Sequence, residues 1–68
     1  MEWKNEVTHK WVVFGDSVID MMKIEAVTPA QLFRDEQWVQ GAHIHTRTQK
    51  YAVVMSVGEV LEIMQEHA

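Results

Sequence analysis

AHIHTRTQKYAVVMSVGEVLEIMQEH, residues 42–67, indicates the architecture of this chain more firmly than any other segment. Its first half alternates apolar and polar residues around a polar segment, which is the pattern of a β-hairpin. Its second half opens with a capping box, in which Ser56 accepts from the Glu59 amide and Glu59 reaches back. A helix over residues 56–67 is therefore predicted, with an apolar stripe at helical spacing that faces the core: Val57, Val60, Leu61 and Met64.

The hairpin has a definite register if Thr48-Gln49 forms its turn. Ile44 then opposes Val53, and Arg47 opposes Lys50. One face is apolar and is expected to be buried: Ile44, Tyr51, Val53 and Met55. The other face carries His43, His45 and Arg47 beside Ala52 and Val54. Thr-Gln is not a preferred pair for a tight turn, so a longer loop that slips the register by one residue and reverses the faces stays open.

Upstream, two segments have strand character. VTHKWVVF, residues 7–14, is rich in β-branched and aromatic residues and ends at a Gly15-Asp16-Ser17 turn signal. VIDMMKIEAV, residues 18–27, alternates less cleanly because Asp20 lies among apolar neighbours. We favour a strand there, and a helical turn over residues 16–22 capped by Ser17 is the alternative.

Two structures compete for residues 29–40. Thr28-Pro29-Ala30-Gln31 resembles a helix start, and Gly41 stands where a left-handed residue would end that helix. A short helix after Pro29 is therefore favoured. The alternative is a strand pair, with residues 34–37 as the turn between Leu32-Phe33 and Trp38-Val39.

Length and composition limit the architecture. A chain of 68 residues is expected to form a single domain, residues 1–68, with a thin core. It has no cysteine, so neither a disulfide nor a thiolate zinc site can stabilise it. The predicted fold class is α+β: an antiparallel sheet of three or four strands packed by the C-terminal helix, with the short helix after Pro29.

Charge and hydropathy exclude several kinds of partner. The first residues, MEWKNEV, form no apolar signal-peptide core, and no apolar run is long enough to span a membrane. A cytoplasmic location without membrane contact is expected. The net charge is −4, with ten carboxylates against six Lys and Arg, which argues against a general nucleic-acid binder.

Residues 18–64 resemble the small flagellar and swarming-motility proteins of the FlbD type. The resemblance is carried by VIDMMKIEAV, HTRTQKYAVV and SVGEVLEIM, which match an acidic-aliphatic strand, a polar hairpin and a Ser-Val-x-Glu-Val helix of that family. It implies the same hairpin-then-helix topology. Residues 30–41 would be an insertion, VTHKWVVF does not match the family's N-terminal strand, and no functional residue is carried over.

VVFGDS, residues 12–17, followed by Asp20, resembles the first block of the GDSL hydrolases, in which the serine is the nucleophile. Such a nucleophile needs a histidine base and oxyanion donors. The later Asp-x-x-His and Gly-x-Asn-Asp blocks are absent, and the chain is too short for the doubly wound sheet that holds them. We interpret the match as a strand leading into a turn, and we predict that the chain is not an enzyme and has no catalytic residue.

Seven residues are candidates for binding a partner. His43 and His45 share a strand face and have metal-ligand spacing, but the interpretation we favour is a polar surface without a metal or other cofactor. Together with Arg47 and Lys50 they form the only local basic patch in the sequence. Three tryptophans in 68 residues indicate either core anchors or a contact surface: Trp3, Trp11 and Trp38.

These features predict a small non-enzymatic protein-interaction or regulatory module that docks to a protein partner or to itself. A homodimer is expected, because so small a core cannot cover all the aromatic and Met side chains. One alternative is a nucleic-acid-associated regulator that uses the His43, His45, Arg47 and Lys50 face. Another is an inhibitor of a host protein encoded by a phage or mobile element.

Overall fold

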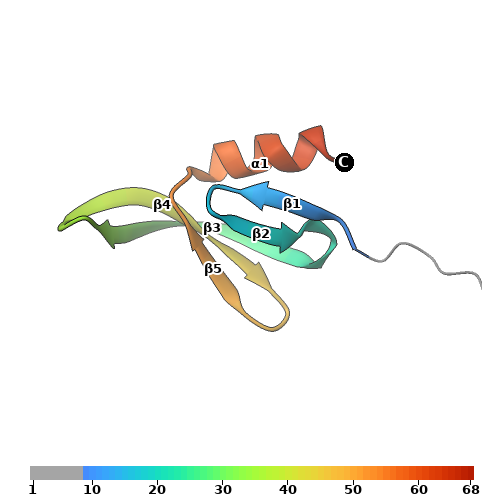
Figure 1. Ribbon diagram of the computed structural model, residues 1–68, viewed down its shortest axis with the longest axis horizontal. Coiled ribbons are helices and arrows are strands. Elements are labelled where there is room, and N and C mark those ends of the chain that lie inside the picture. Colours follow the sequence, from blue (N-terminus) through green and yellow to red (C-terminus); the bar gives the residue numbers. More distant parts are fainter. Residues whose placement is uncertain (1–8) are drawn as a thin grey trace, which may run out of the picture.

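Two antiparallel sheets and one helix form the fold of residues 9–68, the part of the chain that the computed structural model describes (Figure 1). The first sheet pairs β1 (Trp11–Phe14) with β2 (Ser17–Asp20). A 3-10 turn, η1 (Met21–Lys23), leads into the second sheet, whose strand order is β3 (Ile24–Arg34), β4 (Gln37–Thr46) and β5 (Lys50–Val53). The helix α1 (Val57–Glu66) closes the chain. The predicted α+β class is confirmed.

The core lies where α1, the β1–β2 hairpin and the near part of the second sheet meet. Each of these elements places alternate apolar side chains inward, as the periodicity of strands and helices requires. The buried members of this core are Val12, Phe14, Ile19, Ala42, Ile44, Val53 and Val60. Burying side chains of this kind contributes about 1.5–3 kcal/mol for each of the larger ones, which is the main stabilisation available to so small a chain.

The capping box is confirmed. The Glu59 amide donates to Ser56 Oγ over 3.1 Å, and the Ser56 amide donates to Glu59 Oε1 over 2.9 Å. Val57, Val60 and Met64 face the core as predicted, but the place given to Leu61 was wrong. Leu61 is 45% exposed, and Ile63 packs against the core in its stead. The buried face of the helix is centred on Val60, which is fully buried, and it includes Ile63 rather than Leu61.

The predicted register of the β4–β5 hairpin is wrong by two residues. Ile44 opposes Tyr51, and Ala42 opposes Val53. The loop is longer than two residues because Thr46 closes it: its amide donates to the Gln49 carbonyl over 2.9 Å, and its hydroxyl accepts from the Gln49 amide over 3.2 Å. A shift by two keeps the paired side chains of residues 42–45 and 50–53 on their predicted faces, whereas a shift by one would have reversed them.

The short helix after Pro29 is also wrong, and the strand pair is what forms. Phe33 opposes Trp38 and Arg34 opposes Gln37 across a tight turn. Asp35 and Glu36 make that turn with φ values of 51° and 63°, so both lie in the left-handed region that such hairpin turns require. Pro29 lies on the edge strand β3, and edge strands are where sheets tolerate a residue without an amide donor.

Gly41 does not end a helix but lies inside β4, and its lack of a side chain has a packing reason. A Cβ atom at this position would lie 2.5 Å from the Val53 carbonyl oxygen and 2.6 Å from Leu32 Cδ1. Leu32 is buried in the space that the glycine leaves. Only a glycine therefore allows Leu32 and the end of β5 to approach β4 this closely.

The interpretation of residues 7–27 needs two corrections. The first strand begins at Trp11, while Val7 and Thr8 lie outside the described residues. The second strand ends at Asp20, whose carboxylate caps η1 by accepting from the Met22 amide, so neither a continuous strand nor a turn capped by Ser17 forms. Asp20 among apolar neighbours marks the end of a strand.

Candidate functional site

The structure places the candidate residues in three separate regions. Trp38 lies near the tip of the β3–β4 hairpin, while Trp11 and Arg47 line one groove. His43, His45 and Lys50 lie on the outer face of the β4–β5 hairpin. Trp3 falls outside the described residues.

The first region is the arm, defined as residues 30–41, which pair with one another beyond the end of β5. The arm projects away from α1 and from the β1–β2 hairpin (Figure 1). Phe33 and Trp38 form a cross-strand pair at its tip, with ring centroids 5.1 Å apart and an edge-to-face angle of 62°. Phe33 is nevertheless 55% exposed and Trp38 66% exposed. The tip is therefore an ordered aromatic surface, with the acidic pair Asp35-Glu36 beside it.

Strand alternation explains why this pair is apolar. No register shift interrupts β3 between Ala26 and Arg34, so Phe33 lies on the same face as Val27, and Trp38 on the same face as Ile44. Ile44 is buried in the core, whereas no described part of the chain covers the tip. The exposed pair is thus the uncovered continuation of the core face.

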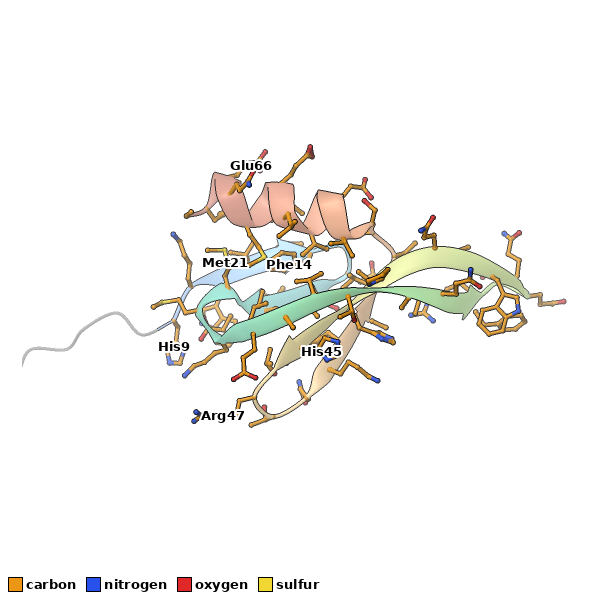
Figure 2. All side chains as sticks on the ribbon, turned by 180° about the vertical axis from the view of Figure 1, so that it is seen from behind. His9, Phe14, Met21, His45, Arg47 and Glu66 are labelled. Atoms are coloured by element: carbon orange, nitrogen blue, oxygen red, sulfur yellow. The ribbon has the colours of Figure 1, made fainter. Side chains whose placement is uncertain are left out.

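The second region is a groove of about 270 Å³ at the other end of the molecule. Trp11 and Tyr51 are its aromatic wall, and Lys23 and Arg47 bring positive charge to it. The rest of the lining consists of His9, Ile19, Asp20, Thr46 and Thr48. His9 and Arg47 mark this end in Figure 2, with the arm at the opposite end. The lining comes from β1 and the residues before it, from β2, from η1 and from the β4–β5 hairpin with its loop.

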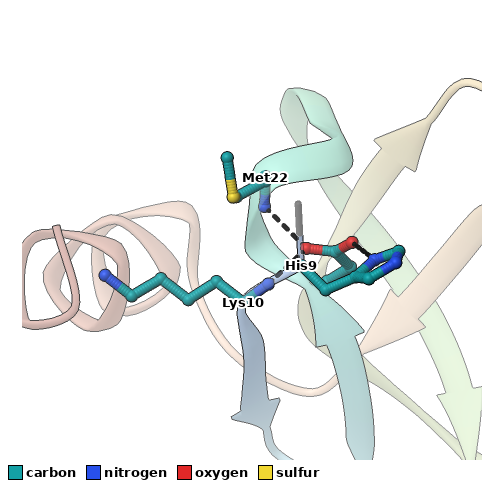
Figure 3. A network of polar contacts seen from close by, with 4 residues as sticks. His9, Lys10 and Met22 are labelled. Atoms are coloured by element: carbon teal, nitrogen blue, oxygen red, sulfur yellow. Dashed lines mark hydrogen bonds and ion pairs between the residues drawn. The ribbon is translucent and has the colours of Figure 1, made fainter. Parts of the chain in front are cut away.

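Asp20 is the structural centre of that groove (Figure 3). It is only 6% exposed, and its Oδ1 accepts from the Lys10 amide over 2.8 Å and from the Met22 amide over 3.1 Å. Its Oδ2 lies 2.7 Å from His9 Nδ1. The Lys10 amide, helped by His9 and the Met22 amide and opposed by burial, holds the pKa of Asp20 below its ordinary value. The carboxylate thus ties the start of β1 to the end of β2.

The third region is the outer face of the β4–β5 hairpin. His43 and His45 lie side by side with ring centroids 6.2 Å apart, and His45 Nε2 is 2.9 Å from the hydroxyl of Thr28. Lys50 opposes His45, but Arg47 belongs to the loop and lines the groove. The predicted basic patch is therefore divided. Residues 9–68 contain no group of three His, Cys, Asp or Glu placed to hold a metal ion.

Ser17 lies at the start of β2 beside a shallow hollow. The described residues that line this hollow include Arg34 and Asp16 but no histidine. The hollow therefore lacks the histidine base of the GDSL hydrolases.

The sequence identified Trp38, Trp11 and Arg47 as separate candidates. It did not predict that Trp38 pairs with Phe33 at the tip, or that Trp11 and Arg47 line one groove. The signal for the tip was available, because two aromatic residues flank a four-residue polar turn. No signal for the groove was available, because its residues come from four separate segments of the chain.

Within residues 9–68, no helix has the length and apolar character needed to cross a membrane. No family model, curated protein or solved structure matches the chain.

Proposed function

We propose that this protein is a non-enzymatic interaction module that docks onto a protein partner through the tip of the arm. The observation that supports this is the exposed Phe33–Trp38 pair on a hairpin that projects from the core. Single exposed apolar residues are normal on protein surfaces. Two aromatic rings in edge-to-face contact at the end of a projecting element form an exposed apolar patch, which is characteristic of contact sites.

The energetics favour contact over folding as the role of the pair. The edge-to-face interaction itself contributes about 0.5–1.5 kcal/mol, and most of the ring surface remains in water. Burying that ring surface against a partner would contribute more free energy than the contact between the two rings does. The two rings contact each other across the hairpin, which restricts their side-chain conformations and lowers the conformational entropy lost on docking. Tryptophan is enriched among the residues that dominate binding energy, and Trp38 is the most exposed large apolar side chain in the described part of the chain.

The alternative of a nucleic-acid-associated regulator has less support. It required His43, His45, Arg47 and Lys50 to act as one basic face, and Arg47 lies apart from the other three. A regulator of this kind must show an affinity for nucleic acid that falls steeply with salt concentration. We expect no such salt-dependent binding.

Site-directed photocrosslinking tests the proposal. A benzoylphenylalanine placed at position 33 of the full chain, expressed in its native cells, should give a crosslinked adduct whose formation is lost when Trp38→Ala is added. The matched control carries the same crosslinker at Leu61, an exposed apolar position on α1. The mass of the adduct identifies the partner as another protein or as a second copy of the chain. Absence of an adduct at position 33, or an equal yield at position 61, would contradict the proposal.

A further inference from the structure

We infer that the arm's partner is a second copy of this chain, and that the tip of one copy inserts into the groove of the other. This inference rests on the proposed docking role of the tip and names its occupant. The tip and the groove are on the same polypeptide, and their chemistry is complementary.

The charges of the two surfaces match. The tip carries Asp35 and Glu36 at the turn beside the aromatic pair, and all four side chains are exposed. The groove carries Lys23 and Arg47 beside Trp11 and Tyr51. Two carboxylates outnumber the one guanidinium of Arg34 at the tip, and the two cations of the groove outnumber the Asp20 carboxylate. The balance of charge is therefore negative at the tip and positive in the groove. Complementary local charge steers association and selects the partner even when both molecules carry the same net charge.

The charged groups on both sides are open to new partners. Within the described chain, the one ion pair joins His9 to Asp20. Lys23 and Arg47 therefore form no ion pair there, although Glu25 shares a neighbouring hollow with them. Asp20, the groove's own carboxylate, already has both oxygens engaged by three donors. The groove's two cations are left to meet an incoming carboxylate.

The positions of the two surfaces favour a closed pair. The groove and the arm tip lie at opposite ends of the molecule, so a chain cannot fill its own groove (Figure 2). Two copies placed side by side in opposite directions would each insert a tip into the other's groove. Such a two-fold arrangement makes both contacts at once, and it leaves neither a tip nor a groove free to bind a further copy.

The same arrangement would cover further exposed apolar surface. Val13 and Val18 oppose each other on the outer face of the β1–β2 hairpin, the face that also carries Trp11. All three are more than half exposed. An arm reaching Trp11 would lie next to them. The contact then extends beyond the tip, as a stable pair of small subunits requires.

A charge-swap experiment tests this pairing. The tip variant carries Asp35→Asn and Glu36→Lys, and the groove variant carries Lys23→Glu and Arg47→Glu. Every changed residue is exposed, so both variants are expected to keep the wild-type circular dichroism spectrum. Sedimentation equilibrium should show a dimer for the wild type and a monomer for each variant alone. An equimolar mixture should restore the dimer, because each of its two contacts again joins opposite charges.

A control separates this pairing from a general effect of charge. Glu66→Gln with Glu62→Lys makes the same change in net charge as the tip variant, at exposed positions on α1 outside the tip and the groove, and should remain dimeric. Dissociation of this control, dimers that survive in the separate variants, or a wild-type monomer up to high micromolar concentration would overturn the inference. A monomer that still crosslinks through position 33 to another protein would support the proposed docking role of the tip. It would overturn only the inference that the partner is a second copy of this chain.

Discussion

The two halves of the β3–β4 hairpin present the same face to different surroundings. Near the core, Ile44 is fully buried under α1 and the β1–β2 hairpin. At the tip, Phe33 and Trp38 continue that face into solvent. Apolar character alone therefore does not determine which residues stabilise the fold. What decides is whether another element lies over them, and in the arm no described element does.

A truncation in the core should have the largest effect on the free energy of unfolding, and the other substitutions can be compared with it. Phe14 is completely buried, so Phe14→Ala removes its transfer free energy and leaves a cavity. We expect a loss of about 3–5 kcal/mol in the free energy of unfolding, a large share of the stability of so small a domain. Urea denaturation followed by circular dichroism measures it. A loss below about 1 kcal/mol would mean that the core is not where the structure places it.

The base of the arm should be sensitive to a single added methyl group. Gly41→Ala would place Cβ against the Val53 carbonyl and Leu32, and we expect a cost of about 1–3 kcal/mol. Reducing the neighbour with Leu32→Ala in the same chain should relieve only part of this cost, because the carbonyl remains. A neutral Gly41→Ala substitution would show that β4 and β5 do not approach each other so closely.

Asp20 makes the stability of the fold depend on pH. Because the folded-state pKa of Asp20 is lowered, its ionised form stabilises the fold above the unfolded value of about 3.9. That contribution is lost as the pH falls through the lower folded value. Asp20→Asn should therefore lower the melting temperature at neutral pH, and the gap to wild type should shrink in acid. A gap that stays constant down to the most acidic pH at which the protein folds would refute this role.

The helix start offers a smaller, local test. Ser56→Ala removes the acceptor for the Glu59 amide and should cost about 1 kcal/mol. In a domain of this length the melting temperature should fall by about 4–8 °C. Ser56→Asp supplies an equivalent acceptor and should restore most of the loss. Equal melting temperatures for the serine and alanine forms would place the start of α1 elsewhere.

The parts of the fold that sequence predicted correctly depend on neighbouring residues. Ser56 and Glu59 are three positions apart, so their capping box could be recognised without knowing what α1 packs against. The faces of the β4–β5 hairpin were also correct, because alternation decides them. Its register was not, because it depends on the hydrogen bonds that Thr46 makes within the loop.

The error at residues 29–40 has a nonlocal cause. Thr28-Pro29 has the local chemistry of a helix start, and Asp35-Glu36 is a poor match to the Asn-Gly or Asp-Gly of a tight hairpin turn. The strand pair forms because β3 continues from residues that pair with the core part of β4, and because Leu32 fits over Gly41. The groove could not be predicted for the same reason, since its lining is assembled only when the sheets meet.

The most direct test of the arm's role is the free energy of unfolding of the Phe33→Ala/Trp38→Ala variant, measured by urea denaturation of dilute protein. If the pair serves contact, the loss should be about 0.5–1.5 kcal/mol, the value of the interaction between the two rings. Dilution matters because self-association would otherwise add to the apparent stability of the wild type. A loss of several kcal/mol, comparable to that of Phe14→Ala, would show that the pair holds the fold together and would contradict the account.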